Sequence, residues 1–241
     1  MNLIGGKNVI CLLLALLICA VFSACVIETD EKPEPPAKSR GSFMEDDPVK
    51  QAASRTPLTI VTRNFTKAGS VVNCPYIASR DMDLLNYSIR SAFADFAETC
   101  AAEDGYVSYS VEFNSMGLLS LTMIMTGPNG LVYFTDTANF NCDSGSRVLL
   151  DDCFGEAYTD YTSRLRGIVE TYAEQNGLEL IGGVPPIRDV SPFIFTENGI
   201  SLVYREYELT TYSDTPVRVP IPLAAVKDLV AVNGVLNRYS P

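Results

Sequence analysis

The stretch that decides the fold is Tyr106–Thr126, YVSYSVEFNSMGLLSLTMIMT. Its two halves, Tyr106–Asn114 and Leu118–Thr126, are rich in β-forming residues, and the short segment SMG separates them. The turn signal GPNG follows at 127–130 and leads into LVYFTDTANF. The sequence therefore predicts three consecutive antiparallel strands.

One segment with helical periodicity precedes this region of the chain, and a second lies after it. Ser79 or Asp81 is the expected N-cap of the first, SRDMDLLNYSIRSAFADFAETCAAEDG, and Gly177 ends the second, EAYTDYTSRLRGIVETYAEQNG. The apolar face of the first consists of Leu85, Ile89, Phe93, Phe96 and Cys100, and that of the second of Tyr158, Tyr161, Leu165, Ile168 and Tyr172. Stripes at this spacing predict helices that pack on a sheet.

The remaining elements are short and rich in strand-forming residues. Leu58–Phe65 alternates as a strand, FIFT and ISLVY are joined by the turn ENG, and VRVPIP forms one more strand before the short helix LAAVKDLV. Because hairpins dominate, the predicted class is α+β, with a mainly antiparallel sheet, two longer helices packed on it and a short C-terminal helix.

The N-terminus predicts export. The apolar run from Val9 to Ala24 is shorter than the roughly 20 residues that a helix needs to cross a bilayer, which favours a signal peptide over an uncleaved membrane anchor. FSAC resembles the lipobox of bacterial lipoproteins, and this resemblance implies that Cys25 becomes the lipidated first residue, carrying acyl chains such as palmitate. The chain is then expected at the cell membrane, lipid-anchored and facing the extracytoplasmic side.

Composition divides the exported chain into a linker and a domain. Residues 1–24 are the predicted signal peptide, 25–57 form a polar, proline-containing linker, and 58–241 form one globular domain. The linker has few residues able to build a core, whereas the domain is long enough to bury one.

Four cysteines remain beyond Cys25, and an even number in an exported chain favours disulfides. Four cysteines permit three pairings. Cys142 and Cys153 flank the turn in NCDSGSRVLLDDC, which makes a local bridge between them geometrically easy, and Cys74 with Cys100 is then left by elimination. No CxxC pattern occurs, so neither a metal site nor a cofactor is expected.

Histidine is absent from the whole chain. This excludes a Ser-His-Asp triad, a Cys-His dyad and a histidine-ligated zinc. No catalytic residue is assigned, and the chain is not expected to be an enzyme. The net charge of −11 argues against a nucleic-acid partner and is compatible with a cationic protein, although acidity alone also serves solubility.

Three segments together carry a family resemblance: VEFNSMGLLSLTMIMT, NFNCDSGSRVLLDDCF, and FIFTENGISLVYREYELTTYS followed by VRVPIPLAAVKDL. Their order resembles the extracellular domain of unknown function shared by the anti-sigma-V factor RsiV and the N-terminal, non-catalytic region of the peptidoglycan deacetylase PdaC. The resemblance implies a binding module that faces the cell wall and, from its anti-sigma member, a lysozyme-like protein as a ligand. It also implies that Leu150 and Phe154 are core positions and that Asp152 caps the second helix.

Tyr207, Glu208 and Tyr212 are the predicted ligand-binding residues, because they lie close together at the expected rim of the sheet. Tyrosine offers a large amphipathic surface and is enriched in binding hot spots. The alternative for each residue is ordinary packing over the sheet or exposure to water.

Three functions follow from these observations: a membrane-anchored binding module for a cationic protein or a cell-wall glycan, a wall hydrolase using two carboxylates, or a structural envelope lipoprotein. The adjacent pairs Glu103–Asp104 and Asp151–Asp152 are the candidates for the hydrolase or for a calcium site. Sequence neighbours usually point apart, so the binding module is the favoured prediction.

Overall fold

The computed structural model describes residues 56–100, 104–155, 158–232 and 234–239, with the side chains of 158–160 left out. Contacts divide the chain into two units, Met1–Glu45 and Asp46–Pro241, and the fold described below belongs to the second. The predicted signal peptide, Cys25 and the linker up to residue 55 lie outside the described residues.

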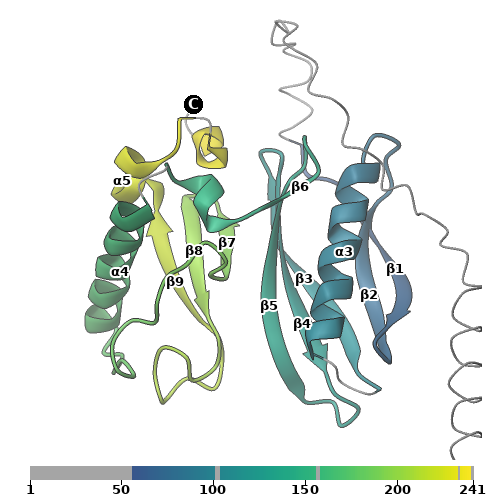
Figure 1. The fold of residues 1–241 in the computed structure, drawn as a ribbon, viewed down its shortest axis with the longest axis horizontal. Coiled ribbons are helices and arrows are strands. Elements are labelled where there is room, and N and C mark those ends of the chain that lie inside the picture. The colour runs from purple at the N-terminus through teal and green to yellow at the C-terminus, as the bar shows by residue number, and fades with distance from the viewer. Residues whose placement is uncertain (1–55, 101–103, 156–157, 233, 240–241) are drawn as a thin grey trace, which may run out of the picture. The chain divides into compact units, whose positions relative to one another are not determined.

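A six-stranded sheet forms the first half of the fold (Figure 1). Its strands, in spatial and chain order, are β1 (Ile60–Lys67), β2 (Ser70–Ile77), β3 (Tyr106–Ser115), β4 (Leu118–Thr126), β5 (Val132–Asn141) and β6 (Ser146–Val148). Neighbours pair antiparallel except β2 with β3, which are parallel. The three predicted antiparallel strands are confirmed as β3, β4 and β5. β2 has no counterpart in the prediction; Pro75 within it is a residue that usually argues against a strand.

A separate three-stranded antiparallel sheet consists of β7 (Phe193–Thr196), β8 (Gly199–Tyr204) and β9 (Val217–Pro222). The predicted ENG hairpin joins β7 to β8, and Gly199 adopts φ +144° there. A Cβ on Gly199 would lie 2.5 Å from the carbonyl oxygen of Ile221, so this close approach of the backbones requires glycine. The mixed α+β class is confirmed, with the strands divided between two sheets.

The two predicted helices are α3 (Asp83–Cys100) and α4 (Tyr158–Gln175). The shorter elements are α5 (Leu223–Val226) and the 3₁₀ turns η1 (Leu150–Cys153), η2 (Lys227–Leu229) and η3 (Val235–Tyr239). None of the described helices combines the length and apolarity that crossing a membrane requires.

Each long helix covers its own core. Four of the five predicted apolar residues of α3 are buried, and Cys100 is half-buried at its end. On α4, Tyr161 and Leu165 are buried as expected, but the core stripe continues through Val169 and Ala173, which leaves Ile168 and Tyr172 half-buried. The i, i+4 spacing of the buried residues places them on one helical face.

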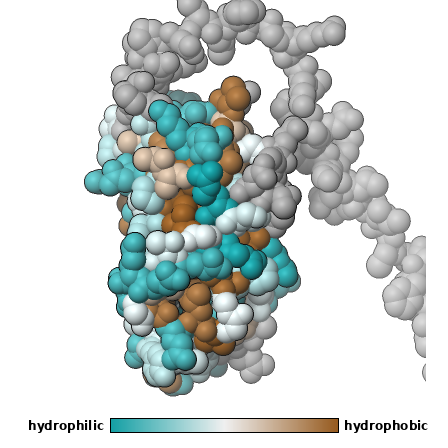
Figure 2. Space-filling model, turned by 90° about the vertical axis from the view of Figure 1, so that its left-hand side faces the viewer, coloured by the Kyte–Doolittle hydropathy of each residue, from teal (hydrophilic) through white to brown (hydrophobic). Residues whose placement is uncertain are grey.

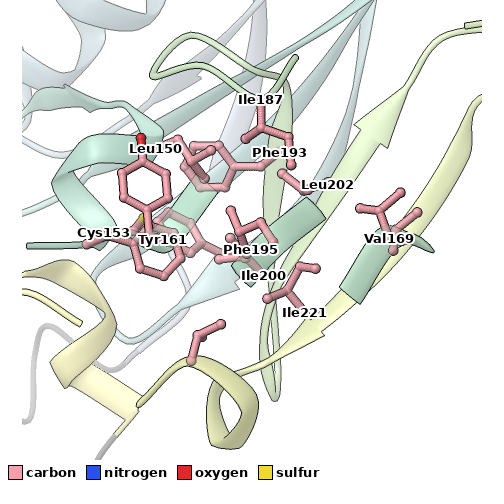
Figure 3. Close-up of a cluster of buried hydrophobic side chains, with 14 of the residues drawn as sticks. Leu150, Cys153, Tyr161, Val169, Ile187, Phe193, Phe195, Ile200, Leu202 and Ile221 are labelled. Carbon is pink, nitrogen blue, oxygen red and sulfur yellow. The ribbon is translucent and has the colours of Figure 1, made fainter. Parts of the chain in front are cut away.

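The two cores lie on opposite faces of the six-stranded sheet. One core joins α3 to this sheet, and includes Phe93, Leu121 and Phe140. The other joins the opposite face to β7, β8, β9 and α4, and Figure 3 shows Phe193, Phe195 and Tyr161 among its side chains.

A buried polar seam joins the two sheets, made by Ser120, Thr137 and Asn139 of the six-stranded sheet. The N–H of Phe193 donates to Thr137 Oγ1 at 3.2 Å, and Asn139 Nδ2 donates to the Phe193 carbonyl at 2.7 Å. The N–H of Phe195 donates to Ser120 Oγ at 2.8 Å, and this hydroxyl donates to Asn139 Oδ1 at 2.5 Å. The free edge of β7 thus obtains side-chain partners from the face of the other sheet, as buried backbone groups require.

The predicted disulfides are wrong, because Cys74, Cys100, Cys142 and Cys153 are free thiols. Cys142 and Cys153 are close in sequence but belong to different cores, on opposite faces of the sheet. Cys74 lies on β2, whereas Cys100 lines a pocket beside β5, with β3 and β4 between these strands. Burial raises the pKa of the Cys74 and Cys142 thiols to about 12.

Candidate binding surface

The predicted contact residues lie on a loop, residues 205–216, which connects β8 to β9 and is called the tyrosine loop below. These residues follow the end of β8 at Tyr204, so they lie on a connecting loop and not on a strand. Leu209 and Thr210 are buried and anchor the loop through a bridge between Leu180 and Thr210. The loop is therefore held at its centre, with its two arms open to solvent.

Tyr207 has a left-handed backbone, with φ +59°. Such a conformation is uncommon for a large side chain and persists only where the surroundings impose it. Here the N–H of Tyr207 donates to the Ser213 carbonyl at 3.0 Å, which ties the two arms together. Tyr207 is 60% exposed and Tyr212 79% exposed, so the loop presents both rings to solvent.

Glu208 closes the turn that carries Tyr207. Its Oε2 accepts a hydrogen bond from the N–H of Arg205 at 2.8 Å, and its own N–H donates to the Arg205 carbonyl at 3.1 Å. The Glu208 side chain is exposed, but one of its two carboxylate oxygens accepts this hydrogen bond. The structure thus brings Tyr207 and Tyr212 onto one loop and gives Glu208 a positioning role.

A second segment, Leu178–Gly183, lies beside the tyrosine loop. The N–H of Ile181 donates to the Leu209 carbonyl at 3.1 Å, and the Ile181 side chain is 43% exposed. Exposed acidic side chains lie on both segments: Glu179, Glu208 and Asp214. The surface formed by these two segments combines aromatic and aliphatic contact area with negative charge.

Two hydroxyl groups are buried near this surface without a partner. Tyr204 Oη and Thr210 Oγ1 make no hydrogen bond within the described part of the chain. Burial raises the pKa of the Tyr204 phenol, and the negative charge of Glu208 raises it further. Unpaired buried hydroxyls cost free energy. These two hydroxyls therefore lower the stability of this region, unlike the hydrogen-bonded side chains of the seam.

A groove of about 940 Å³ runs along α4. Its floor includes Gly167, Ile168 and Tyr172 of the helix and Pro220 and Pro222 of β9. Figure 2, which views this side, shows hydrophobic patches interrupted by hydrophilic side chains. Nothing in the groove pairs two carboxylates, since Asp228 is the one acidic residue among its described lining and is bound to Arg164 at 3.2 Å.

A second groove, of about 690 Å³, lies between β3 and the β7–β8 hairpin and contains Glu112. Arg218 of β9 donates two hydrogen bonds to Glu112, at 2.8 and 3.0 Å, and Ser110 and Thr122 donate at 2.6 and 2.8 Å. The hydrogen bonds from Arg218 are the main reason that the pKa of Glu112 falls from its ordinary 4.5 to about 2, although burial opposes this change. Glu112 is therefore ionised at neutral pH and bridges the two sheets; it is not placed as a general acid.

Of the predicted carboxylate pairs, Asp151–Asp152 serves local structure, whereas Glu103 of the other pair lies outside the described residues. Asp152 Oδ2 accepts from the N–H of Leu149 at 2.7 Å within η1, so the expectation that it caps the second helix is wrong. Asp151 accepts from the Tyr161 hydroxyl. Leu150 and Phe154 are buried, as the resemblance implied. Within the described ranges, no group of three or more cysteine or acidic side chains is arranged to hold a metal ion.

Several of these features have no local pattern in the sequence that predicts them. Ile181 follows Leu180 in a short segment without periodicity, and the Glu112–Arg218 bridge joins residues 106 positions apart. The apolar run after GPNG is visible in the sequence, but only the structure shows that Val132, Tyr133 and Phe134 at the start of β5 are exposed.

No family model matches the chain, and no curated protein matches its sequence. A crystal structure of a DUF3298 family protein from Pseudomonas aeruginosa PAO1 superposes with a TM-score of 0.54 at 16% identity, over 75% of this chain and 97% of that one. A DUF3298 family member from Bacteroides fragilis NCTC 9343 gives 0.50 at 15% identity, over 77% and 99%. These neighbours share the fold and fit a domain of unknown function. The resemblance to the RsiV and PdaC domains stays a prediction.

Proposed function

We propose that this protein is a membrane-anchored extracytoplasmic binding module that recognises a cationic protein through the tyrosine loop. The observation that carries the proposal is the exposed Tyr207 ring on a left-handed backbone, held in place by Ser213 and by the Glu208 turn. Strain of this kind at an exposed aromatic residue is typical of functional surfaces. The surrounding acidic side chains favour a basic partner by electrostatic steering.

The sequence resemblance points to a lysozyme-like protein as the partner and to peptidoglycan fragments as the competing ligand. Both are extracytoplasmic, in agreement with a lipid anchor on Cys25. A Cys25→Ala variant should move from the membrane fraction to the soluble fraction and lose incorporation of labelled palmitate. Unchanged membrane retention and labelling would contradict the anchor.

Calorimetry of the purified chain against a basic lysozyme tests the binding surface. Tyr207→Ala and Tyr212→Ala are each expected to weaken binding by at least about tenfold, as removal of a hot-spot aromatic does. Thr211→Ala is the matched control, since Thr211 is exposed on the same loop. Raising the salt concentration should weaken binding further, because charges at the rim are screened. Lysozyme binding that is unchanged in both tyrosine variants would show that the site lies elsewhere. Binding heat with muropeptides but not with lysozyme would show that the ligand is a glycan and not a protein.

Tyr207→Asn separates binding from stability. Asparagine tolerates the left-handed backbone far better than tyrosine, so the free energy of unfolding should rise by about 0.5–1 kcal/mol while lysozyme binding falls. Tyr212→Asn should lower binding and leave stability unchanged. A Tyr207→Asn variant that is both less stable and fully active would contradict the idea that strain is retained for recognition.

A further inference from the structure

One edge of β5 is largely unpaired. β6 pairs only with Asn139–Asn141, so residues 132–138 have no neighbouring strand on that side within the described part of the chain (Figure 1). The apolar residues at the start of this edge are exposed by 44% to 62%: Leu131, Val132, Tyr133 and Phe134. Natural proteins usually shield an edge of this kind.

The edge has open backbone hydrogen-bonding groups. The N–H of Thr137 donates to the Oδ1 of Asp136 at 2.8 Å, which shows that it points away from β4. In an antiparallel strand every second residue directs its N–H and C=O to the same side, so Thr135 points outward as well. Thr137 is capped by a side chain, whereas Thr135 faces the space where a further strand would lie.

Two small pockets flank this edge, one on each face of the sheet. The pocket on the α3 face, of about 230 Å³, has an apolar floor that includes Phe96, Met123 and Phe134. The pocket on the β7 face, of about 280 Å³, has polar walls that include Asn139 and Ser191. Alternate side chains of an added strand point to opposite faces, so one strand would fill both pockets.

Two opposite charges lie where the two pockets meet, because Asp136 and Arg147 each line both. Arg147 lines both and has no ion-pair partner within the described residues. The other arginine of the α3-side pocket, Arg205, is paired with Asp136 at a long 3.8 Å and is half-exposed, so this pair yields readily to a ligand. An unpaired guanidinium beside an open strand edge is complementary to a carboxylate.

We propose that the β5 edge binds an extended peptide segment of a partner protein. This segment pairs with β5 through Thr135, inserts an apolar side chain into the α3-side pocket and places a carboxylate beside Arg147. The site touches the tyrosine loop only at Arg205, the first residue of that loop, and does not depend on the function proposed for the loop.

The probe is a short fluorescent peptide of alternating valine and threonine that ends in glutamate and has an amidated C-terminus, with an amidated version ending in glutamine as its control. Binding to the full chain is measured by fluorescence anisotropy. Thr135→Pro removes the outward N–H and should lower affinity at least about tenfold, whereas Thr135→Val keeps the N–H and should bind normally. Arg147→Gln should weaken the glutamate peptide several-fold and leave the glutamine peptide unchanged.

Circular dichroism establishes whether each variant is folded. If Thr135→Pro does not fold, the binding of the two peptides to Arg147→Gln and to the unaltered chain still tests the proposal. Equal binding of both peptides to both Arg147 forms, or full binding to folded Thr135→Pro, would overturn it. Self-association that blocks the peptide and disappears in Thr135→Pro would also overturn it, because a second copy would then occupy the edge. Tyr212→Ala should bind the peptide as the unaltered chain does.

Discussion

Asn139→Ala is expected to lower the free energy of unfolding by about 2–4 kcal/mol, since it leaves two buried groups unpaired. The Phe193 carbonyl loses its donor at 2.7 Å, and the Ser120 hydroxyl loses its acceptor at 2.5 Å. Both Ser120 and Asn139 are buried, so water does not replace them without rearrangement. Urea unfolding followed by circular dichroism measures the change, because the chain has no tryptophan for fluorescence.

Thr135→Val is the matched control on the same strand and should change stability by less than about 0.5 kcal/mol. A double-mutant cycle with Ser120→Ala should show coupling of at least about 0.5 kcal/mol, since the two side chains share a hydrogen bond. Loss of less than about 1 kcal/mol in Asn139→Ala, with no coupling, would mean that the seam does not hold the sheets together.

Glu112→Gln is expected to lower stability at pH 7 by about 1–3 kcal/mol, because it removes the charge that Arg218 binds through two hydrogen bonds. The unfolded chain protonates this carboxyl near its ordinary pKa of 4.5, whereas the folded protein holds it ionised until about 2. The stabilisation from Glu112 is thus complete above about pH 4.5 and is lost as the pH falls through about 2.

The difference in stability between the two proteins should therefore narrow as the pH falls from 4.5 towards 2. Urea titrations at several pH values measure this difference. Glu197→Gln is the control, since Glu197 is an exposed carboxylate in the same groove. A Glu112→Gln deficit that stays constant over this range would show that packing, rather than charge, accounts for the loss.

Most of the secondary structure could be predicted from local patterns. The alternation in Leu118–Thr126 and the turn at 127–130 give β4 and its hairpin, and the spacing of Leu85, Ile89 and Phe93 gives α3. These signals arise within one element, where side-chain direction follows from backbone period alone. β2 was not predicted, because Pro75 contradicts the usual composition of a strand. In the structure Pro75 lies opposite Thr62 of β1, and the antiparallel pair accommodates it there.

The candidate site was only partly predictable. The residue types at Tyr207 and Tyr212 indicated a contact surface, and the structure places both on one exposed loop. The left-handed backbone of Tyr207 and the neighbouring Ile181 depend on hydrogen bonds to Ser213 and Leu209. The disulfide prediction was wrong because it relied on the even number of cysteines. That number carries no information about which face of a sheet each thiol occupies.

The sequence by itself determined the class of the fold, its hairpins, its two long helices and the absence of imidazole chemistry. Only the tertiary structure decided how the strands divide into two sheets and which polar side chains join them. The bonds that join the seam to β7 link residues 54 to 75 positions apart, and the Glu112–Arg218 bridge links residues 106 apart. Local periodicity reports which face of an element is apolar, but the partner of a buried polar group is set by which distant segment packs against it.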